Sequence, residues 1–434
     1  MSESARALAR EIFLHALGES SIERAMEREV SCERGVLRVG DDLHHLARYS
    51  RVLAVSFGKA GQRMAECLAR QVGSTVGGIV ADPNPPVHQL PGYRYFAGSH
   101  PQPNAESVRG AEAILKSLGA LNPQALVIFM ISGGGSSVVE KPADPAIVLP
   151  DLIATYKTLV LSGAPIAEIN AVRKHLSATK GGRMAQAAPS VQQVSILVSD
   201  VPERSLDSLA SGPTMPDSST VEDCCRIVNQ YKMLGDFPAS VRELFERRAL
   251  EETPKQGDPA FARSRWWTVL SNATVEKAAA KAAGERGFTV EIDHSCDDWD
   301  YVRAADYLLG RLRIMAREVP RACIVSGGEV TVKVCGSAGT GGRNQHFVLY
   351  CAKKIADENI TVLSAGTDGL DGNSNAAGAV VDGTTIERTR AAGIDADQSL
   401  SGFNSSPLFE KLGDAIQTGP TGNNVRDLRI LIAG

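Results

Sequence analysis

Several glycine-rich turns in this sequence carry a cation or a carboxylate, and such turns are suited to binding anions. The first is VSFGKAG, residues 55–61, where a short apolar run meets a glycine turn and then a helical pattern. A turn of this kind offers backbone N–H groups and the positive end of a helix dipole to an anion. Gly58 belongs to the turn, and Lys59 adds a full positive charge. A tight turn with a solvated lysine is the alternative, and this turn alone leaves both interpretations open.

The second turn, ISGGGSS at residues 131–137, follows a strongly apolar run directly. Three consecutive glycines let the backbone approach a ligand closely and adopt positive φ angles. Two serines at the start of the following helix add hydroxyl donors. The combination favours phosphate or carboxylate binding over a flexible linker. The predicted binding residues are Ser132, Gly133, Gly134, Gly135, Ser136 and Ser137.

A carboxylate and another tight turn follow in residues 197–217. Asp200 stands at the end of an apolar run, a common place for a magnesium-binding carboxylate. A helix N-cap explains this residue equally well. Gly212 lies in the turn SGPT, residues 211–214, and is a further candidate for ligand contact.

The segment VRKHLSATKGG, residues 172–182, gathers four basic side chains. Helical spacing cannot place Arg173, Lys174, His175 and Lys180 on one face, and a solvated basic helix is the usual explanation of such a run. His175 alone is no evidence for a catalytic base. Lys174 is nevertheless a candidate for binding phosphate or substrate.

The C-terminal part contributes two glycine turns that each lead to a charged residue. Gly327 and Gly328 precede Glu329, and Gly342 precedes Arg343 in GTGGRNQ. The paired glycines predict backbone loops close to a ligand. Because Arg343 stands just ahead of a helical pattern, its guanidinium is suited to a two-bond grip on phosphate or carboxylate.

The loop AGTDGLDGNSNAAG, residues 365–378, places Asp368 and Asp371 after another apolar run. Acidic residues alternating near glycine suggest a calcium loop, but the D-x-D-x-D-G frame and the terminal Glu of an EF-hand are missing. The loop therefore gives candidate carboxylates without a calcium motif.

Composition and missing motifs argue against several function classes. The formal net charge of -4 argues against a broad nucleic-acid surface. The eight cysteines show no C-x-x-C pair, and neither a signal peptide nor an apolar run of membrane length is apparent. We therefore expect a cytoplasmic protein that binds no membrane. There is no Walker A loop, G-x-G-x-x-G fingerprint, G-x-S-x-G elbow or H-E-x-x-H pair. Cations, carboxylates and backbone donors remain, and phosphoryl transfer requires these parts.

The elements that must position these turns alternate between strands and helices. An amphipathic helix is predicted at 3–18, and a polar stretch with two prolines and no periodicity divides the chain into domains 1–250 and 260–434. The alternation predicts an α/β protein with a mainly parallel sheet, whose ligands bind beyond the carboxyl ends of the strands. Strands are predicted at 52–56, 126–131, 193–198, 322–325 and 361–364.

Ten segments, in order, resemble the class II glycerate 2-kinase family. Besides those quoted above they include GSHPQPN at 98–104, INAVRKHLSATKGGRMA at 169–185 and TGPTGNNVRDL at 418–428. The resemblance runs from about residue 5 to residue 432. It implies a Rossmann-like N-terminal domain and a C-terminal MOFRL domain. It also implies transfer of a phosphoryl group from ATP to the 2-hydroxyl of D-glycerate, with Mg²⁺ or a similar divalent ion.

The same resemblance implies roles for particular residues. It identifies Lys59 and Arg343 as the key active-site cations, and it places acidic residues at Asp200, Glu329 and Asp368. We predict that Asp200 and Asp368 hold the metal ion or accept the hydroxyl proton, with their roles exchangeable. The remaining predicted binding residues are Gly58, Ser132, Gly133, Gly134, Gly135, Ser136, Ser137, Lys174, Gly212, Gly327, Gly328, Glu329, Gly342 and Asn344.

These expectations place the site in a cleft between the two domains, with D-glycerate and ATP as partners and a homodimer as an open possibility. The chain departs from the usual family pattern at FNSSP, residues 403–407, and at Asn423, where Thr is usual. Two alternatives remain: an NAD(P)H-dependent hydroxypyruvate reductase, a label that family members often carry, and a non-catalytic sensor of sugar acids or nucleotides. The missing dinucleotide fingerprint argues against the reductase.

Overall fold

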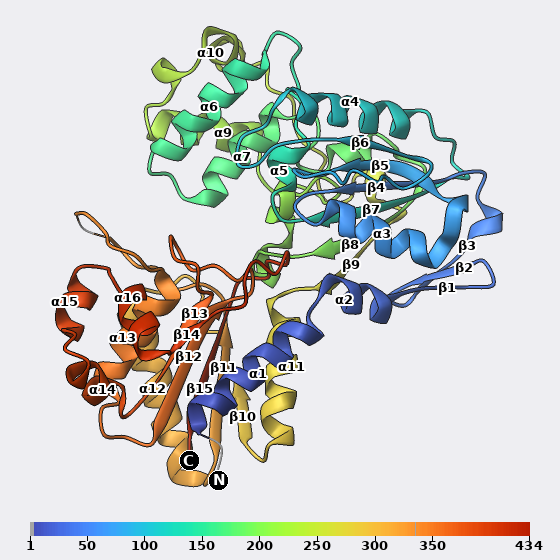
Figure 1. Ribbon diagram of the computed structural model, residues 1–434. Helices are drawn as coiled ribbons and strands as arrows, with labels where there is room; N and C mark the ends of the chain where they lie inside the picture. The colour runs from blue at the N-terminus through green and yellow to red at the C-terminus, as the bar shows by residue number, and fades with distance from the viewer. Residues whose placement is uncertain (1–3, 335) are drawn as a thin grey trace. The chain divides into compact units, whose positions relative to one another are not determined.

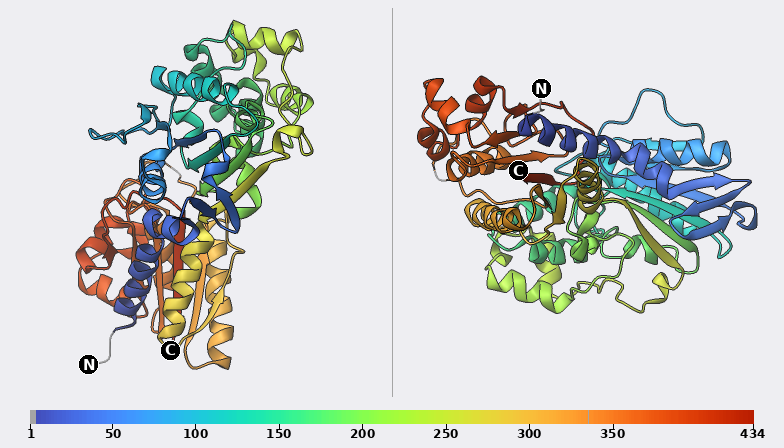
Figure 2. Two further views of the ribbon diagram at one scale, coloured as in Figure 1. Left: turned by 90° about the vertical axis from the view of Figure 1, so that its right-hand side faces the viewer. Right: turned by 90° about the horizontal axis from the view of Figure 1, so that it is seen from below.

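The computed structural model describes residues 4–334 and 336–434, which divide into two units (Figures 1 and 2). Residues Ala25–Val269 form what we call the middle unit. The terminal unit combines the chain up to Arg24 with Leu270–Gly434. Each unit contains its own six-stranded sheet, and each is described separately below.

The middle unit is built on a sheet whose strand order is β6-β5-β4-β7-β8-β9. All pairings from β6 to β8 are parallel, which confirms the predicted parallel α/β sheet. The central strands are apolar runs because both faces of a parallel sheet are buried. The strands are β4 (Val52–Phe57), β5 (Gly77–Ala81), β6 (Tyr93–Phe96), β7 (Leu126–Ser132), β8 (Gln192–Val198) and β9 (Ser264–Leu270).

Helices cover this sheet and also form a separate apolar group. α3 (Gly61–Val72) packs on β4, β5 and β7, and α4 (Ala105–Gly119) packs on β5 and β6. A second core joins α6 (Leu149–Leu161), α7 (Ile166–Leu176), α9 (Val221–Gln230) and α10 (Ala239–Glu246). A small antiparallel sheet contains β1 (Val30–Glu33), β2 (Val36–Val39) and β3 (Asp42–His45). Short helices are α2 (Ile22–Glu29), α5 (Gly135–Val138) and α8 (Arg183–Gln186).

The terminal unit contains a mixed sheet in the order β10-β11-β15-β12-β13-β14. Only β10 and β11 pair in parallel, so the expected mainly parallel arrangement does not extend to this unit. The last strand arrives from a loop and inserts between β11 and β12, antiparallel to both. The strands are β10 (Thr289–Ile292), β11 (Ala322–Gly327), β12 (Ile360–Gly366), β13 (Gly378–Asp382), β14 (Ala415–Ile416) and β15 (Asp427–Ala433).

Helices pack against both faces of this mixed sheet (Figure 1). α12 (Tyr301–Glu318) and α13 (Arg343–Lys354) share a core with alternate strand residues such as Ile324 and Val362. α1 (Ala5–Glu19) and α11 (Asn272–Glu285) contact each other and the same strands. Shorter helices are α14 (Thr385–Ala391), α15 (Ala396–Ser401) and α16 (Ser406–Leu412).

The predicted N-terminal helix is present, and it packs within the terminal unit. Ile12 and Phe13 are fully buried, and α1 contacts α11, β12, β13 and β15. The sequence placed this helix in a domain of residues 1–250 because local patterns give no information on which distant segment a helix covers. The exact domain boundaries stay a prediction.

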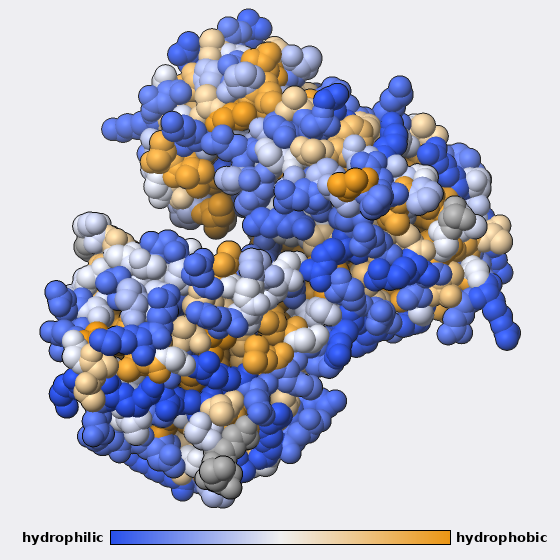
Figure 3. All heavy atoms as spheres, viewed as in Figure 1, coloured by the Kyte–Doolittle hydropathy of each residue, from blue (hydrophilic) through white to orange (hydrophobic). Residues whose placement is uncertain are grey.

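The faces visible in Figure 3 are largely hydrophilic, with scattered apolar side chains. Among residues 4–334 and 336–434, no helix combines the length and the apolar character that crossing a membrane requires.

Candidate active site

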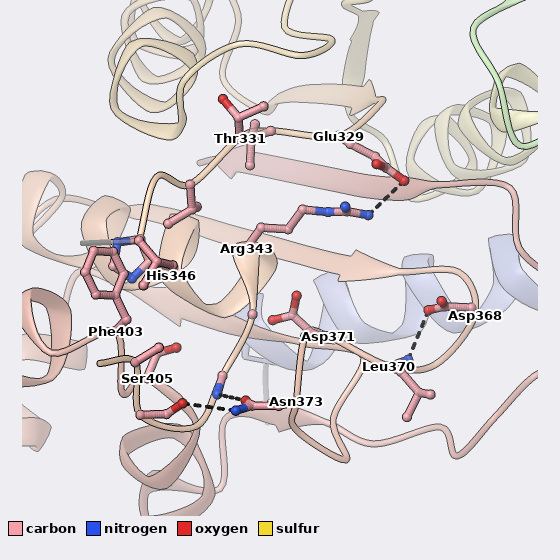
Figure 4. A pocket seen from close by; sticks show the side chains of 18 of the residues that line it. Glu329, Thr331, Arg343, His346, Asp368, Leu370, Asp371, Asn373, Phe403 and Ser405 are labelled. Atoms are coloured by element: carbon pink, nitrogen blue, oxygen red, sulfur yellow. Dashed lines mark hydrogen bonds and ion pairs between the residues drawn. The ribbon is translucent and has the colours of Figure 1, made fainter. Parts of the chain in front are cut away.

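The terminal unit contains a pocket of about 730 Å³ at the start of α13 (Figure 4). Its walls come from the segment after β11, the glycine loop before α13 and the loop after β12. The lining includes Glu329, Arg343, Asp368 and Asp371. The fold therefore brings four of the predicted C-terminal site residues, Glu329, Gly342, Arg343 and Asp368, to one pocket, together with Asp371.

Arg343 is the first residue of α13 and follows Gly342, the extended N-cap. Its Nε donates to Asp427 Oδ2 at 2.6 Å, and its Nη2 donates to Asp427 Oδ1 at 3.1 Å. Nη2 also lies 2.8 Å from Glu329 Oε1, the ion pair drawn in Figure 4. Burial disfavours the charged guanidinium, but hydrogen bonding and attraction from these carboxylates outweigh it and raise the pKa of Arg343. The cation is therefore permanent and held in one orientation.

Glu329 is the more weakly held of the two carboxylates around Arg343. Burial raises the pKa of Glu329, while attraction from Arg343 lowers it in part. A single oxygen of Glu329 contacts the guanidinium, whereas Asp427 uses both oxygens. An anionic ligand could therefore replace Glu329 on Arg343 more easily than it could replace Asp427.

Asp427 is a residue that the sequence analysis missed. It is the first residue of β15 and is 2% exposed. Its carboxylate accepts a hydrogen bond from Arg343 Nε. Asp427 lies in the motif TGPTGNNVRDL, whose local pattern indicates a glycine-rich turn and gives no role to the carboxylate. Because Arg343 lies 84 residues earlier in the chain, no local spacing could connect the two.

We predict that Asp427→Asn lowers kcat about 10-fold, because a misoriented Arg343 stabilises the transferring group less well. Steady-state kinetics would measure this loss. Asp427 acts through Arg343, so the double variant Asp427→Asn/Arg343→Met should be no slower than Arg343→Met alone. Losses that simply multiply in the double variant would contradict the positioning role.

Within the SGGE turn, the Glu329 side chain lines the pocket, whereas the backbone N–H groups of residues 327–329 donate to other side chains. The N–H of Gly327 donates to Glu276 Oε1 at 2.7 Å, and that of Gly328 donates to Asn272 Oδ1 at 2.6 Å. The N–H of Glu329 donates to Asp297 Oδ1 at 3.2 Å. The predicted ligand contacts of this turn stay a prediction, with the Glu329 carboxylate as its group in the pocket.

Two carboxylates of the loop after β12 have different surroundings. Asp371 is buried and accepts the N–H groups of Asn344 at 3.0 Å and Gln345 at 2.8 Å, so it anchors the start of α13. Asp368 is half-buried, accepts the N–H of Leu370 at 3.1 Å, and borders the pocket. Asp368 is therefore better placed to meet a ligand, and Asp371 to hold the helix that carries Arg343.

We predict a pH-dependent contribution of Asp371 to stability. Burial raises the pKa of its carboxyl to about 6, against the lowering effect of the two N–H donors. Because the folded state binds the proton more tightly, this contribution is full below the unfolded pKa and is lost as the pH rises through about 6. Asp371→Asn cannot titrate, so its destabilisation relative to the wild type should shrink from pH 4 to pH 7. Urea unfolding across this range would contradict the prediction if the difference stayed constant or grew.

An aromatic wall lines the pocket away from Glu329 (Figure 4). His346 stacks on Phe403 with ring centroids 5.1 Å apart, and burial lowers the pKa of His346 to about 4. Phe403 begins the segment FNSSP, where the sequence departs from the usual family pattern. This wall is uncharged at neutral pH, so it offers a planar apolar surface in a pocket whose other groups are ionic.

The middle unit gathers a second group of predicted residues at the ends of β4, β7 and β8. Lys59 donates its backbone N–H to Gly133 O at 2.9 Å. A Cβ built on Gly134 would lie 3.1 Å from Lys59 Cγ and 3.0 Å from His100 Cδ2. A Cβ built on Gly133 would overlap the Asp200 carboxylate. The glycines therefore leave room for Lys59, His100 and Asp200 around one turn.

His100, in the segment GSHPQPN, is a second residue whose local sequence indicates no role. Burial and the nearby positive charge of Lys59 lower the pKa of His100. A neutral imidazole therefore lies beside the exposed lysine and leaves Lys59 as the positive charge of this group.

The serines and Gly212 hold the second turn in place. Ser132 Oγ accepts the N–H of Ala60 at 3.0 Å and so joins the two glycine turns. Ser136 Oγ lies 3.0 Å from Ser211 Oγ, and Ser137 Oγ donates to Gly134 O at 3.2 Å. The other predicted members are Gly58 at φ +111°, Gly135 at the start of α5 and Gly212 at φ +62°. Contacts of these residues with a ligand stay a prediction.

Lys174 is held by two carboxylates of its own unit. Its ammonium nitrogen lies 3.1 Å from Asp217 Oδ1 and 3.2 Å from Asp207 Oδ2, and its side chain is buried. Such a pair stabilises the contact between α7 and the 207–217 segment. Binding of phosphate or substrate by Lys174 stays a prediction.

The two predicted metal ligands lie in different units, Asp200 in the middle unit and Asp368 in the terminal unit. Within the described part of the chain, no three His, Cys, Asp or Glu side chains come together as a metal cage.

Comparison with known proteins identifies the chain. Residues 8–246 match DUF4147, described as a domain of unknown function, and residues 322–427 match the MOFRL family. The glycerate 2-kinase of Pyrococcus horikoshii is 34% identical over 389 residues, covering 88% of this chain and 87% of that protein. The D-glycerate 2-kinase of Thermotoga maritima is 35% identical over 387 residues, covering 88% and 90%. A relative from Agrobacterium vitis, 36% identical over 394 residues, is named provisionally as a hydroxypyruvate reductase.

Solved structures agree with this result. A crystal structure of a Pyrococcus horikoshii protein superimposes with a TM-score of 0.87 at 31% identity, covering 100% of this chain and 99% of that chain. A crystal structure of glycerate kinase from Thermotoga maritima gives a TM-score of 0.86 at 32% identity, covering 100% of both chains. With its DUF4147 and MOFRL segments and these relatives, the chain belongs to the glycerate 2-kinase family.

Proposed function

We propose that this protein transfers the γ-phosphoryl group of ATP to the 2-hydroxyl of D-glycerate, giving 2-phosphoglycerate and ADP. The observation that carries the proposal is the identity of 34% and 35% with two glycerate 2-kinases over 88% of the chain. The site chemistry supports it, because each unit provides a cation next to a glycine turn or a helix start. A cleft between the domains, a homodimer and a cytoplasmic location stay predictions.

Lys59 and Arg343 would serve as the charge-stabilising groups of this reaction. The transferring phosphoryl group spreads negative charge over three oxygens, so catalysis depends largely on positioned positive charge. Arg343 is fixed by Asp427 before any ligand arrives, which removes the cost of orienting it later. Glu329 would leave the guanidinium when an anionic ligand binds.

Asp200 and Asp368 remain the proposed carboxylates for Mg²⁺ or for the proton of the substrate hydroxyl. Magnesium in kinases is usually bound by one or two carboxylates together with phosphate oxygens and water, so a cage of three side chains is not required. Both carboxylates border turns that carry predicted site residues, which fits such a partial ligand set. The ion would neutralise charge on the phosphate oxygens.

Phosphorus NMR of the protein with MgATP and D-glycerate tests the proposal directly. We expect ADP to appear together with a signal of 2-phosphoglycerate, distinguishable from that of 3-phosphoglycerate. The name of the Agrobacterium relative makes a reductase the second candidate. Oxidation of NADH in the presence of hydroxypyruvate, with no phosphoryl transfer to glycerate, would replace the kinase proposal with that one.

A further inference from the structure

A buried polar cluster in the middle unit has no role in the site described above. It joins Glu140, which follows α5, with Tyr156 on α6 and Arg173 on α7. Ser177 and Lys180, just beyond α7, complete it. All five side chains lie within the middle unit, and Glu140 and Lys180 are almost completely buried.

Glu140 is fully engaged by other members of the cluster. Its Oε2 accepts the Tyr156 hydroxyl at 2.7 Å and the Lys180 ammonium group. Its Oε1 accepts the Ser177 hydroxyl at 2.6 Å and the backbone N–H of Lys141 at 2.9 Å. A carboxylate with four donors is satisfied, and its charge is balanced by that of Lys180.

Arg173 is left without a carboxylate. No hydrogen bond or ion pair joins its guanidinium to any residue of the described chain, and its Nε is buried with no acceptor. Its contact is with the face of the Tyr156 ring, whose centroid lies 4.8 Å from Cζ. A guanidinium has five donors and no acceptor and stays charged in proteins, so a largely buried one needs an anion.

The neighbouring residue Lys174 differs from Arg173, because the chain supplies it with carboxylate partners. Lys174 holds both Asp207 and Asp217, while Arg173 holds neither and contacts the Tyr156 ring on α6. Burial lowers the pKa of Arg173, and the attraction of Tyr156 and Glu140 offsets this effect only in part. The described chain therefore supplies no carboxylate to Arg173, and its guanidinium is available to an anion from outside the chain.

We infer that Arg173 binds the carboxylate of the acceptor substrate. The cluster carries one net positive charge, since Glu140 cancels Lys180, and one charge matches a carboxylate better than a polyphosphate. The planar fork of Arg173 fits the two oxygens of a carboxylate, and Tyr156 supports the guanidinium from one face. This inference rests on the proposed function, because it takes D-glycerate as the acceptor.

Arg173→Met tests the inference by separating the two substrates. We expect the KM for D-glycerate to rise at least about 10-fold, the size of one lost charge-assisted contact, with the KM for ATP within twofold of wild type. The same substitution at Arg242 on α10, whose side chain is 41% exposed, is the control and should change neither constant. An unchanged KM for D-glycerate, or a rise in the KM for ATP instead, would overturn the assignment.

Two further measurements keep the test independent of folding. Without substrate, Arg173→Met should melt no lower than wild type, because an uncompensated charge has been removed, whereas a purely structural role predicts a lower Tm. Glycerol lacks the carboxylate, so the rate measured with glycerol as the acceptor should be equal in wild type and variant. If the Met variant does not fold, Arg173→Lys keeps the charge but loses the fork and should still raise the KM for D-glycerate.

Wild-type protein that does not phosphorylate D-glycerate would refute the proposed function itself, a result that no Arg173 variant can produce.

Discussion

Arg343→Met should lower kcat for D-glycerate phosphorylation by at least about 100-fold, since one well-placed arginine can supply 10³–10⁵ in phosphoryl transfer. Arg343 is the cation that lines the terminal-unit pocket at the start of α13, and two carboxylates hold it in position. Met keeps much of the side-chain volume, so the loss reports on charge. A coupled assay of ADP formation at saturating substrates measures it.

Arg313→Met is the matched control for this substitution. Arg313 also makes a two-bond contact with one carboxylate, that of Glu358, at 2.9 and 2.7 Å. It is 38% exposed, against 37% for Arg343, but it lies on α12 and does not line the pocket. Its loss should leave kcat within about twofold. Near-normal turnover of Arg343→Met would remove Arg343 from the mechanism.

Lys59→Met should also lower kcat by at least about 100-fold, because it removes the positive charge beside the GGGSS turn. Lys59 is exposed, and its stem lies along Gly134. The nearby His100 does not replace the charge, because burial, the larger cause of its lowered pKa, remains in the variant. Steady-state kinetics, with D-glycerate and ATP varied separately, should show that kcat falls. Raising the concentration of either substrate should not restore the rate.

Lys116→Met is the control for Lys59, since Lys116 is an exposed lysine in the last turn of α4. It should retain wild-type kinetics. If Lys59→Met instead raised only the KM for ATP and kept kcat, Lys59 would contribute to nucleotide binding without stabilising the transition state.

The sequence predicted the positions of the main strands and turns closely. Strands expected at 52–56 and 126–131 are β4 (Val52–Phe57) and β7 (Leu126–Ser132). These predictions succeed because a buried parallel strand is a local apolar run, and the glycines that end it are local too. The glycine turns beside Lys59 and Arg343 were identified on the same basis.

Local sequence patterns could not predict which distant residues form ion pairs or which strands lie side by side. Nothing near Arg343 in the sequence indicates Asp427, and nothing in VRKHLSATKGG indicates that Lys174 is paired while Arg173 is not. The same applies to β15, which inserts antiparallel between β11 and β12. Ion pairing and strand order depend on tertiary structure, so the chemical state of each cation became visible only in the fold.

The first helix of the chain has a consequence for how this protein is made. During synthesis, α1 leaves the ribosome well before the strands and the helix that bury Ile12 and Phe13, which are translated only after Leu270. The nascent middle unit can complete its own sheet while α1 waits with its apolar side exposed. A fragment that starts near residue 260 would lack this helix, so the apolar surface of β12, β13 and β15 that α1 covers would be exposed to solvent. Separate expression of the MOFRL half therefore calls for a fusion of residues 4–24 to residues 270–434.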